Sequence, residues 1–186
     1  MPRHIAVIHE ASCAPRSRPR VRTSLDGKPF ALTEGMSLPK KILVPTDFSE
    51  TSDRALDYAI DLASRIGASV VVMHAYELPI VVFPYSTSIP TADVAARIAT
   101  AAQSGLDAIV TARIARGVDL KKVLKQDAPW DAVNTVAKEV GADLVVCGTH
   151  GRKGLGHALL GSVAEKIVRT SDVPVLTIRG PREESK

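Results

Sequence analysis

The chain has 186 residues, of which 45% are hydrophobic and 24% are charged, and this composition is typical of one globular domain with a sizeable core. No apolar run reaches the roughly 18 residues of a membrane-spanning helix, and the first residues do not resemble a signal peptide. We therefore expect a cytoplasmic protein without membrane contact. Two isolated cysteines, Cys13 and Cys147, suit a reducing compartment and argue against a disulfide framework or a zinc site.

The net charge of +4 comes largely from the N-terminal segment. Residues 1–35 contain six basic and three acidic residues, which leaves 18 basic and 17 acidic residues in the rest of the chain. A nearly neutral body does not support an extended DNA-binding face, so we expect no nucleic-acid partner.

Residues 1–38 show weak hydrophobic periodicity and contain the basic run PRSRPRVR, so they are predicted to be a mostly disordered extension with short order only in HIAVI. Met36 stands just before the patterned part of the chain and is a candidate start. Residues 39–181 are predicted to form the domain, and residues 182–186 a C-terminal tail.

From Lys40 onward, short apolar β-branched runs alternate with stretches whose apolar residues recur at helical spacing. The first helix can be capped by Ser49 or Thr51 and is ended by Gly67. The segment 78–90 contains three prolines and is predicted to be a loop. The predicted strands cover residues 41–45, 69–75, 118–126, 143–148 and 173–179, and the helical patterns cover residues 56–66, 91–116, 130–140 and 160–168.

Five strands separated by four helices predict an α/β fold: a doubly wound five-stranded parallel sheet, expected order 3-2-1-4-5, with helices on both faces. In such sheets ligands bind beyond the carboxyl ends of the strands, where the strand order reverses. Two unusual loops follow strands in this chain: PTD at 45–47, and a glycine-rich segment after the fourth strand.

The glycine-rich segment, residues 146–166, reads VCGTHGRKGLGHALLGSVAEK and holds five of the chain's 12 glycines. Glycines let backbone N–H groups approach a phosphate closely, and a helix that begins after the loop adds free N–H groups. Neither familiar phosphate motif is present. After Gly151 and Gly156, His157 and Ala158 stand where a Walker A loop has Lys and Ser or Thr, and Leu159 breaks the dinucleotide fingerprint.

The segment resembles the nucleotide-binding branch of the universal stress protein family, whose loop reads G-x2-G-x9-G-[ST]. Gly148, Gly151, Gly161 and Ser162 match each position without a gap. ILVPTDFS after the first strand and VPVLTIR at the end also resemble the family, and the likeness covers residues 40–180. One departure is Asp127, where the family usually has glycine, and there we expect only a different turn shape.

The resemblance implies that ATP binds here, with Mg or Mn left open as its counterion. On the nucleoside side it implies Pro45, Thr46 and Asp47, with Ala75 beside the adenine. At the ribose and phosphates it implies Gly148 and Gly151, and along the phosphate chain Gly161, Ser162 and Val163; Cys147 is placed in the same pocket. The resemblance also implies a homodimer through the last strand, whose apolar edge would otherwise be exposed. No catalytic residue and no protein ligand for a metal is assigned.

Several of these residues also have interpretations that need no ligand. Ser162 begins the pattern S-x-x-E and could form a capping box. Asp47 could cap the helix that follows it, His74 near a strand end suits a structural role, and Cys147 suits a small buried hydrophobic residue.

The leading hypothesis is an ATP-binding, nucleotide-dependent module in stress response or signalling. The alternatives are a weak ATPase that uses the same pocket and a non-nucleotide-binding adaptor of the same fold. Any hydrolysis should be slow, because the sequence offers no catalytic base, arginine finger or Walker-type lysine.

Overall fold

The structure is a computed structural model of the chain, and it describes residues 5–7, 37–79, 81–83, 86–88, 90–151 and 160–180. Met1–Ile8 and Pro39–Lys186 form one compact unit, and His9–Leu38 form a second. Every helix and strand described below belongs to the first unit. Within the described ranges, no helix is long and apolar enough to cross a membrane.

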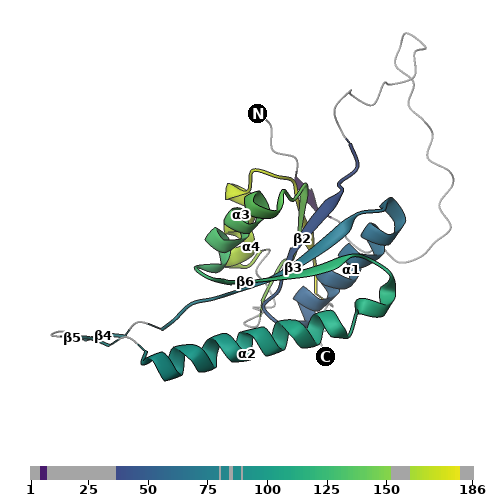
Figure 1. Cartoon of the computed structure of the whole chain (residues 1–186). Helices are drawn as coiled ribbons and strands as arrows, with labels where there is room; N and C mark the ends of the chain where they lie inside the picture. The colour runs from purple at the N-terminus through teal and green to yellow at the C-terminus, as the bar shows by residue number, and fades with distance from the viewer. Residues whose placement is uncertain are drawn as a thin grey trace, which may run out of the picture. The chain divides into compact units, whose positions relative to one another are not determined.

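A parallel sheet forms the centre of the first unit, with strand order β1-β8-β7-β2-β3-β6 (Figure 1). Its strands are β1 (Ile5–Val7), β2 (Lys41–Pro45), β3 (Ser69–Tyr76), β6 (Leu120–Gln126), β7 (Leu144–Gly148) and β8 (Val175–Ile178). Every neighbouring pair in it is parallel. The five strands predicted from the sequence are β2, β3, β6, β7 and β8, and their predicted order 3-2-1-4-5 is confirmed.

The strand β1 is an addition to the predicted sheet. It lies in the HIAVI stretch and pairs with the outer side of β8, where Ile5 is opposite Val175 and Val7 is opposite Thr177. The expectation that the last strand has an exposed edge is therefore wrong within this chain. The physical reason is that an apolar run of β-forming residues can satisfy the open backbone groups of β8. Residues 1–4 and 8–36 of the predicted extension lie outside the described residues.

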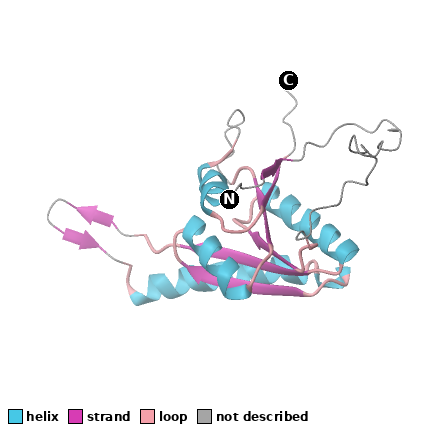
Figure 2. Cartoon of the chain, turned by 90° about the horizontal axis from the view of Figure 1, so that it is seen from above, coloured by secondary structure: helices cyan, strands magenta, loops and turns pink. Residues whose placement is uncertain are grey.

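Helices cover both faces of the sheet (Figure 2). The helical elements are α1 (Glu50–Ile66), α2 (Ala92–Thr111), the short 3-10 helix η1 (Ile114–Arg116), α3 (Pro129–Val140) and α4 (Ser162–Thr170). Side chains of β2 alternate between two buried cores: Ile42 and Val44 pack with α1 and α2, whereas Leu43 packs with α3 and α4. Burial on both faces explains why the central strands are continuous apolar runs.

Local signals set the ends of α1. Ser49 is its N-cap, and the side chains and backbone of Ser49 and Ser52 form a reciprocal capping box. Gly67 ends the helix in the left-handed conformation, with φ of 72°. Of the two predicted caps, the structure therefore uses Ser49, and the predicted terminating glycine is confirmed.

Three predicted boundaries are wrong. Segment 78–90 is predicted to be a loop, but β4 (Val81–Phe83) and β5 (Ser86–Ser88) form an antiparallel pair, in which the β-forming residues of β4 supply one strand. The predicted helix 91–116 ends at Thr111 and continues as η1. The fourth helix begins at Ser162, so Leu160 precedes it.

Candidate functional site

A cavity of about 660 Å³ opens at the carboxyl ends of β2, β3 and β7, beside α3 and α4. Between β2 and β7 the order of the strands reverses, and this is where doubly wound sheets place their ligands. The wall contains every binding residue inferred from the sequence: Pro45, Thr46, Asp47, Ala75, Cys147, Gly148, Gly151, Gly161, Ser162 and Val163. Two loops far apart in the sequence therefore meet at one cavity.

The loop from β2 to α1 is fixed by a local network of hydrogen bonds. The Thr46 N–H donates to the Met73 carbonyl at 2.8 Å, which holds the loop against β3. One carboxylate oxygen of Asp47 accepts from the Ser49 N–H at 3.1 Å and from the Ser49 hydroxyl at 2.6 Å. Asp47 therefore supports the capping residue, and the interpretation of Asp47 as the cap itself is wrong.

His74, the next residue of β3, also holds this loop. Its Nδ1 lies 2.7 Å from the Thr46 carbonyl oxygen, and its ring lies against Phe48 with the ring centroids 4.2 Å apart. A carbonyl can only accept, so Nδ1 carries the proton. Phe48 is the one non-glycine residue with positive φ in the part of the chain that the structure describes. The structural role considered for His74 is thus present, and it acts on a loop that lines the cavity.

Two glycines of the motif pack tightly against other protein groups. A Cβ at Gly148 would lie 2.8 Å from Cγ2 of Thr51 and 3.2 Å from the Thr51 backbone. A Cβ at Gly151 would overlap the Asp47 carboxylate. Both positions require glycine for packing with the start of α1 and the loop before it, independently of a ligand.

Gly161 and Ser162 form the start of α4 at the cavity wall. Gly161 is the N-cap, it makes no side-chain cap, and its N–H donates to the Thr149 carbonyl at 2.7 Å. Ser162 is therefore the first helical residue, and the capping-box interpretation, which placed Ser162 at the cap, is wrong. The backbone N–H groups of the first turn have no partner within a helix, so they are available as donors at the cavity.

Cys147 is the last residue but one of β7 and lines the apolar side of the cavity, with 3% of its surface exposed. Burial raises the pKa of the Cys147 thiol to about 12. The group is therefore a neutral thiol at neutral pH, which suits a small apolar wall residue and not a thiolate nucleophile.

The charged groups of the described wall are carboxylates. Asp47 and Glu165 line it, and no lysine or arginine does so in residues 37–79, 90–151 and 160–180. The basic pair Arg152 and Lys153 lies outside the described residues. No group of three or more His, Cys, Asp or Glu residues that could hold a metal is found in the described portion of the chain.

Sequence reasoning missed the helix residues of the wall. Pro129 and Val133 come from α3, and Ala164 and Ile167 come from α4. The sequence shows their apolar side chains at helical spacing, but a helix has this pattern whether it faces a packed core or a cavity. Only the position of α3 and α4 over the carboxyl edge separates the two cases.

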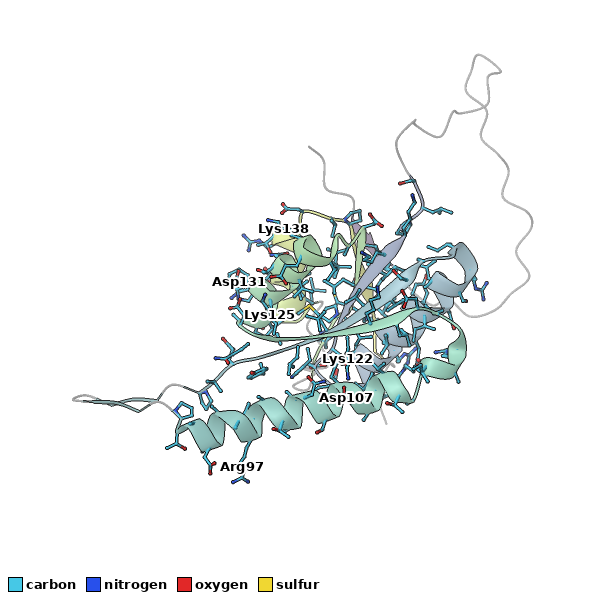
Figure 3. All side chains as sticks on the ribbon, viewed as in Figure 1. Arg97, Asp107, Lys122, Lys125, Asp131 and Lys138 are labelled. Carbon is cyan, nitrogen blue, oxygen red and sulfur yellow. The ribbon has the colours of Figure 1, made fainter. Side chains whose placement is uncertain are left out.

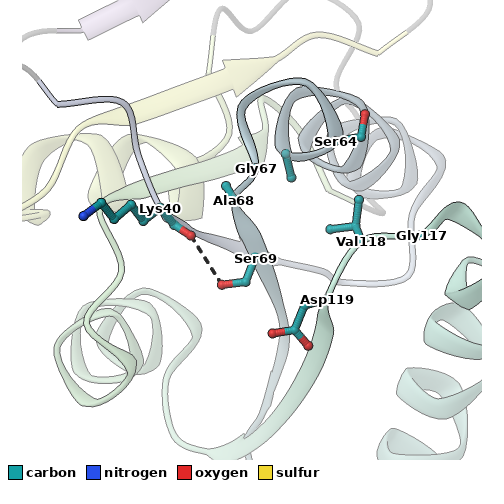
Figure 4. Close-up of a pocket in the computed structure, with 9 residues that line it drawn as sticks. Lys40, Ser64, Gly67, Ala68, Ser69, Gly117, Val118 and Asp119 are labelled. Atoms are coloured by element: carbon teal, nitrogen blue, oxygen red, sulfur yellow. Dashed lines mark hydrogen bonds between the residues drawn. The ribbon is translucent and has the colours of Figure 1, made fainter.

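A second hollow, of about 460 Å³, lies at the amino ends of β2, β3 and β6 (Figure 4). Here the Ser69 N–H and the Ser69 hydroxyl both donate to the Lys40 carbonyl, at 2.9 Å and 3.4 Å. Gly67 and Gly117, which both have positive φ, contribute to its wall. None of the binding residues inferred from the sequence lies there.

Together, the fold and the cavity define a doubly wound α/β protein with a pocket at the point where its strand order reverses. The model of the universal stress protein family matches residues 39–179, and the chain belongs to this family. Universal stress protein MJ0531 of Methanocaldococcus jannaschii is 30% identical over 154 residues, which cover 82% of this chain and 89% of that protein.

Solved structures share the fold. A universal stress protein in complex with cAMP is 30% identical, covers 77% of this chain and 98% of its own, and superposes with a TM-score of 0.56. The universal stress protein from Archaeoglobus fulgidus in complex with dAMP has a TM-score of 0.55 at 23% identity, and the match covers 74% of this chain and 96% of that one. Because the sequences are only 23% identical, the similarity to the dAMP complex supports the fold alone.

Proposed function

We propose that the cavity binds ATP and that the chain acts as a nucleotide-dependent module in stress response or signalling. The observation that carries this proposal is that residues inferred from two separated motifs, together with Ala75, all line one wall. The complex of a 30% identical universal stress protein with cAMP supports an adenine nucleotide as the class of ligand.

One side of the cavity suits the base of an adenine nucleotide, and the other side suits its phosphates. Met73, Ala75, Val133 and Cys147 form an apolar side that suits a flat base. The other side is formed by the start of α4, where backbone N–H groups and the Ser162 hydroxyl can donate to phosphate oxygens. We place the adenine beside Ala75 and the phosphates beside Gly161.

A divalent cation fits the charge of this site. Asp47 and Glu165 lie in the wall, and their carboxylates would repel a triphosphate unless a cation came between them. We therefore propose that Mg or Mn accompanies the ATP. The cation would neutralise phosphate charge.

The proposed activity is binding and not rapid turnover. A fast phosphoryl transfer needs a group that positions water and cations that stabilise the transition state. In the described wall, the acidic groups are Asp47 and Glu165, and no arginine or lysine accompanies them. ATP therefore serves as a bound signal whose presence or absence distinguishes two states of the module.

The test compares ATP and adenosine binding by calorimetry in the natural chain and in Gly161→Ala. Position 161 has φ of −71° and ψ of 155°, which any residue adopts, and an added Cβ would lie 3.1 Å from the Thr149 carbonyl. We expect ATP affinity to fall at least tenfold, or about 1.4 kcal/mol, while adenosine loses much less because it lacks phosphates.

Gly141→Ala is the matched control. Gly141 has φ of 64° and lies outside the cavity wall, so the substitution strains the backbone without changing the pocket. It should leave both affinities unchanged. Failure of the natural chain to bind either compound, together with no nucleotide in mass spectra of natively purified protein, would favour the non-nucleotide-binding adaptor.

A further inference from the structure

The two outer strands of the five-stranded part of the sheet differ in charge. On one side, β6 carries three lysines, and their partners are Asp107 for Lys122, Glu139 for Lys125 at 2.7 Å and Asp119 for Lys121 at 3.8 Å. Figure 3 labels Lys122, Lys125 and Asp107. Charged side chains along an outer strand oppose the addition of another strand. The lysines of β6 therefore oppose the pairing of another strand at this edge of the sheet.

The other side has no such protection. The residues of β8 are Val175, Leu176, Thr177 and Ile178, which are uncharged. An uncharged outer strand with free backbone groups is a template for another strand. In this chain β1 occupies that position, in parallel register with β8 from Val175 to Thr177.

The pairing of β1 with β8 extends over only three residues of each strand. β1 has three residues, and residues 8–40 separate it from β2. A ladder of three residues contains only a few backbone hydrogen bonds, each of which adds only modestly to stability. A parallel ladder is also slightly less stable per residue than an antiparallel one. The pairing of β1 with β8 should therefore open reversibly.

A second copy of this chain is the occupant that fits the opened edge. Two β8 strands can pair antiparallel about a two-fold axis, so that each copy satisfies the backbone groups of the other. We propose that residues 5–7 compete with a second copy of the chain for the outer edge of β8. The N-terminal strand thus sets the balance between monomer and dimer, and this inference does not depend on nucleotide binding.

The test measures dimerisation of the full chain by sedimentation without nucleotide. Ala6→Pro and Val7→Pro each remove an N–H from β1 and disfavour its ladder, while Ala11→Pro is the matched control beyond the strand. We expect one or both of the first two variants to lower the dimer Kd by roughly tenfold or more, and the control to match the natural chain.

A peptide of residues 1–10 provides a second test of the competition for the β8 edge. Added to the proline variant that dimerises more tightly, it should return the protein to the monomer, whereas the same peptide with Ala6→Pro should have no effect. Unchanged dimerisation in both variants would overturn the competition, and so would a dimer that the peptide does not dissociate. Loss of folding in the variants would also overturn it, because β1 would then be part of the folding core. Since nucleotide is absent throughout, failure of ATP binding would leave these outcomes unaffected.

Discussion

His74 Nδ1 lies 2.7 Å from the carbonyl oxygen of Thr46, across the space between two neighbouring strand ends. This bond ties the end of β3 to the loop that carries Asp47. His74→Leu removes the donor and leaves the carbonyl without this partner, so the free energy of unfolding should fall by about 1–3 kcal/mol. Urea unfolding without ligand measures the change.

His74→Asn is the matched variant, because its side-chain amide can place a donor near the position of Nδ1. It should recover much of the stability that His74→Leu loses. Equal losses in both variants would show that the contact of the His74 ring with Phe48, and not the hydrogen bond, is what matters.

Gly148 provides a test of why glycine stands in the motif. A Cβ there would meet Cγ2 of Thr51 at 2.8 Å, so Gly148→Ala should lower the free energy of unfolding by about 1–3 kcal/mol without any ligand. Adding Thr51→Ser removes that methyl group and should recover part of the loss. If Gly148→Ala unfolds like the natural chain but no longer binds ATP, approach of the ligand and not packing would be the reason for this glycine.

Cys147 should make the fold sensitive to alkaline pH. Its pKa in the folded chain is raised to about 12, whereas an unfolded thiol titrates near 8.5. The contribution of the neutral thiol is fully present below the unfolded pKa, and it is lost as the pH rises toward the folded pKa. Between about pH 9 and 12 the free energy of unfolding should therefore fall by up to about 1.4 kcal/mol per pH unit from this group.

Cys147→Val removes the titrating group and should flatten this part of the pH profile. In a Cys13→Ala background, Cys147 should also resist a thiol reagent at about pH 8 until the chain is unfolded. Rapid labelling of the folded chain under these conditions would contradict the burial of the thiol.

Arg113 connects the end of α2 to the acidic side of α1. Its side chain is 15% exposed and lies 2.9 Å from Asp57 and 3.5 Å from Asp53. A double-mutant cycle of Arg113→Ala with Asp57→Ala should give a coupling of about 1 kcal/mol. Raising the salt concentration from about 0.1 M to 1 M should reduce this coupling energy. The more exposed pair of Lys138 and Asp172, 3.0 Å apart, is the control and should couple more weakly.

Local features of the sequence predicted much of the fold. The cap at Ser49 and the terminating Gly67 depend on residues within one helix, and the prediction of both is confirmed. The pairing of β1 with β8 could not be predicted in the same way, because Ile5 and Val175 are far apart in the sequence and their register depends on the finished sheet.

In the candidate site, too, local features could be predicted from the sequence and long-range contacts could not. Gly148, Gly151, Gly161 and Ser162 stand at motif spacing, so they could be named from the sequence. The Thr51 packing against Gly148 could not, because it depends on how α1 crosses the start of the glycine loop. The glycine inside α2 has a comparable origin, since a Cβ at Gly105 would lie 3.0 Å from the Phe48 ring.

The charged edge of β6 limits how large an assembly of this chain can become. Growth into a filament by strand pairing needs two receptive edges per subunit, one to join the preceding copy and one to accept the next. In the proposed dimer a second copy occupies the β8 edge, which leaves β6, with Lys121, Lys122 and Lys125, as the outer strand of this sheet. Under this proposal, strand pairing through this sheet would end at two copies, and a rise in protein concentration would fill pairs without adding further copies to the sheet.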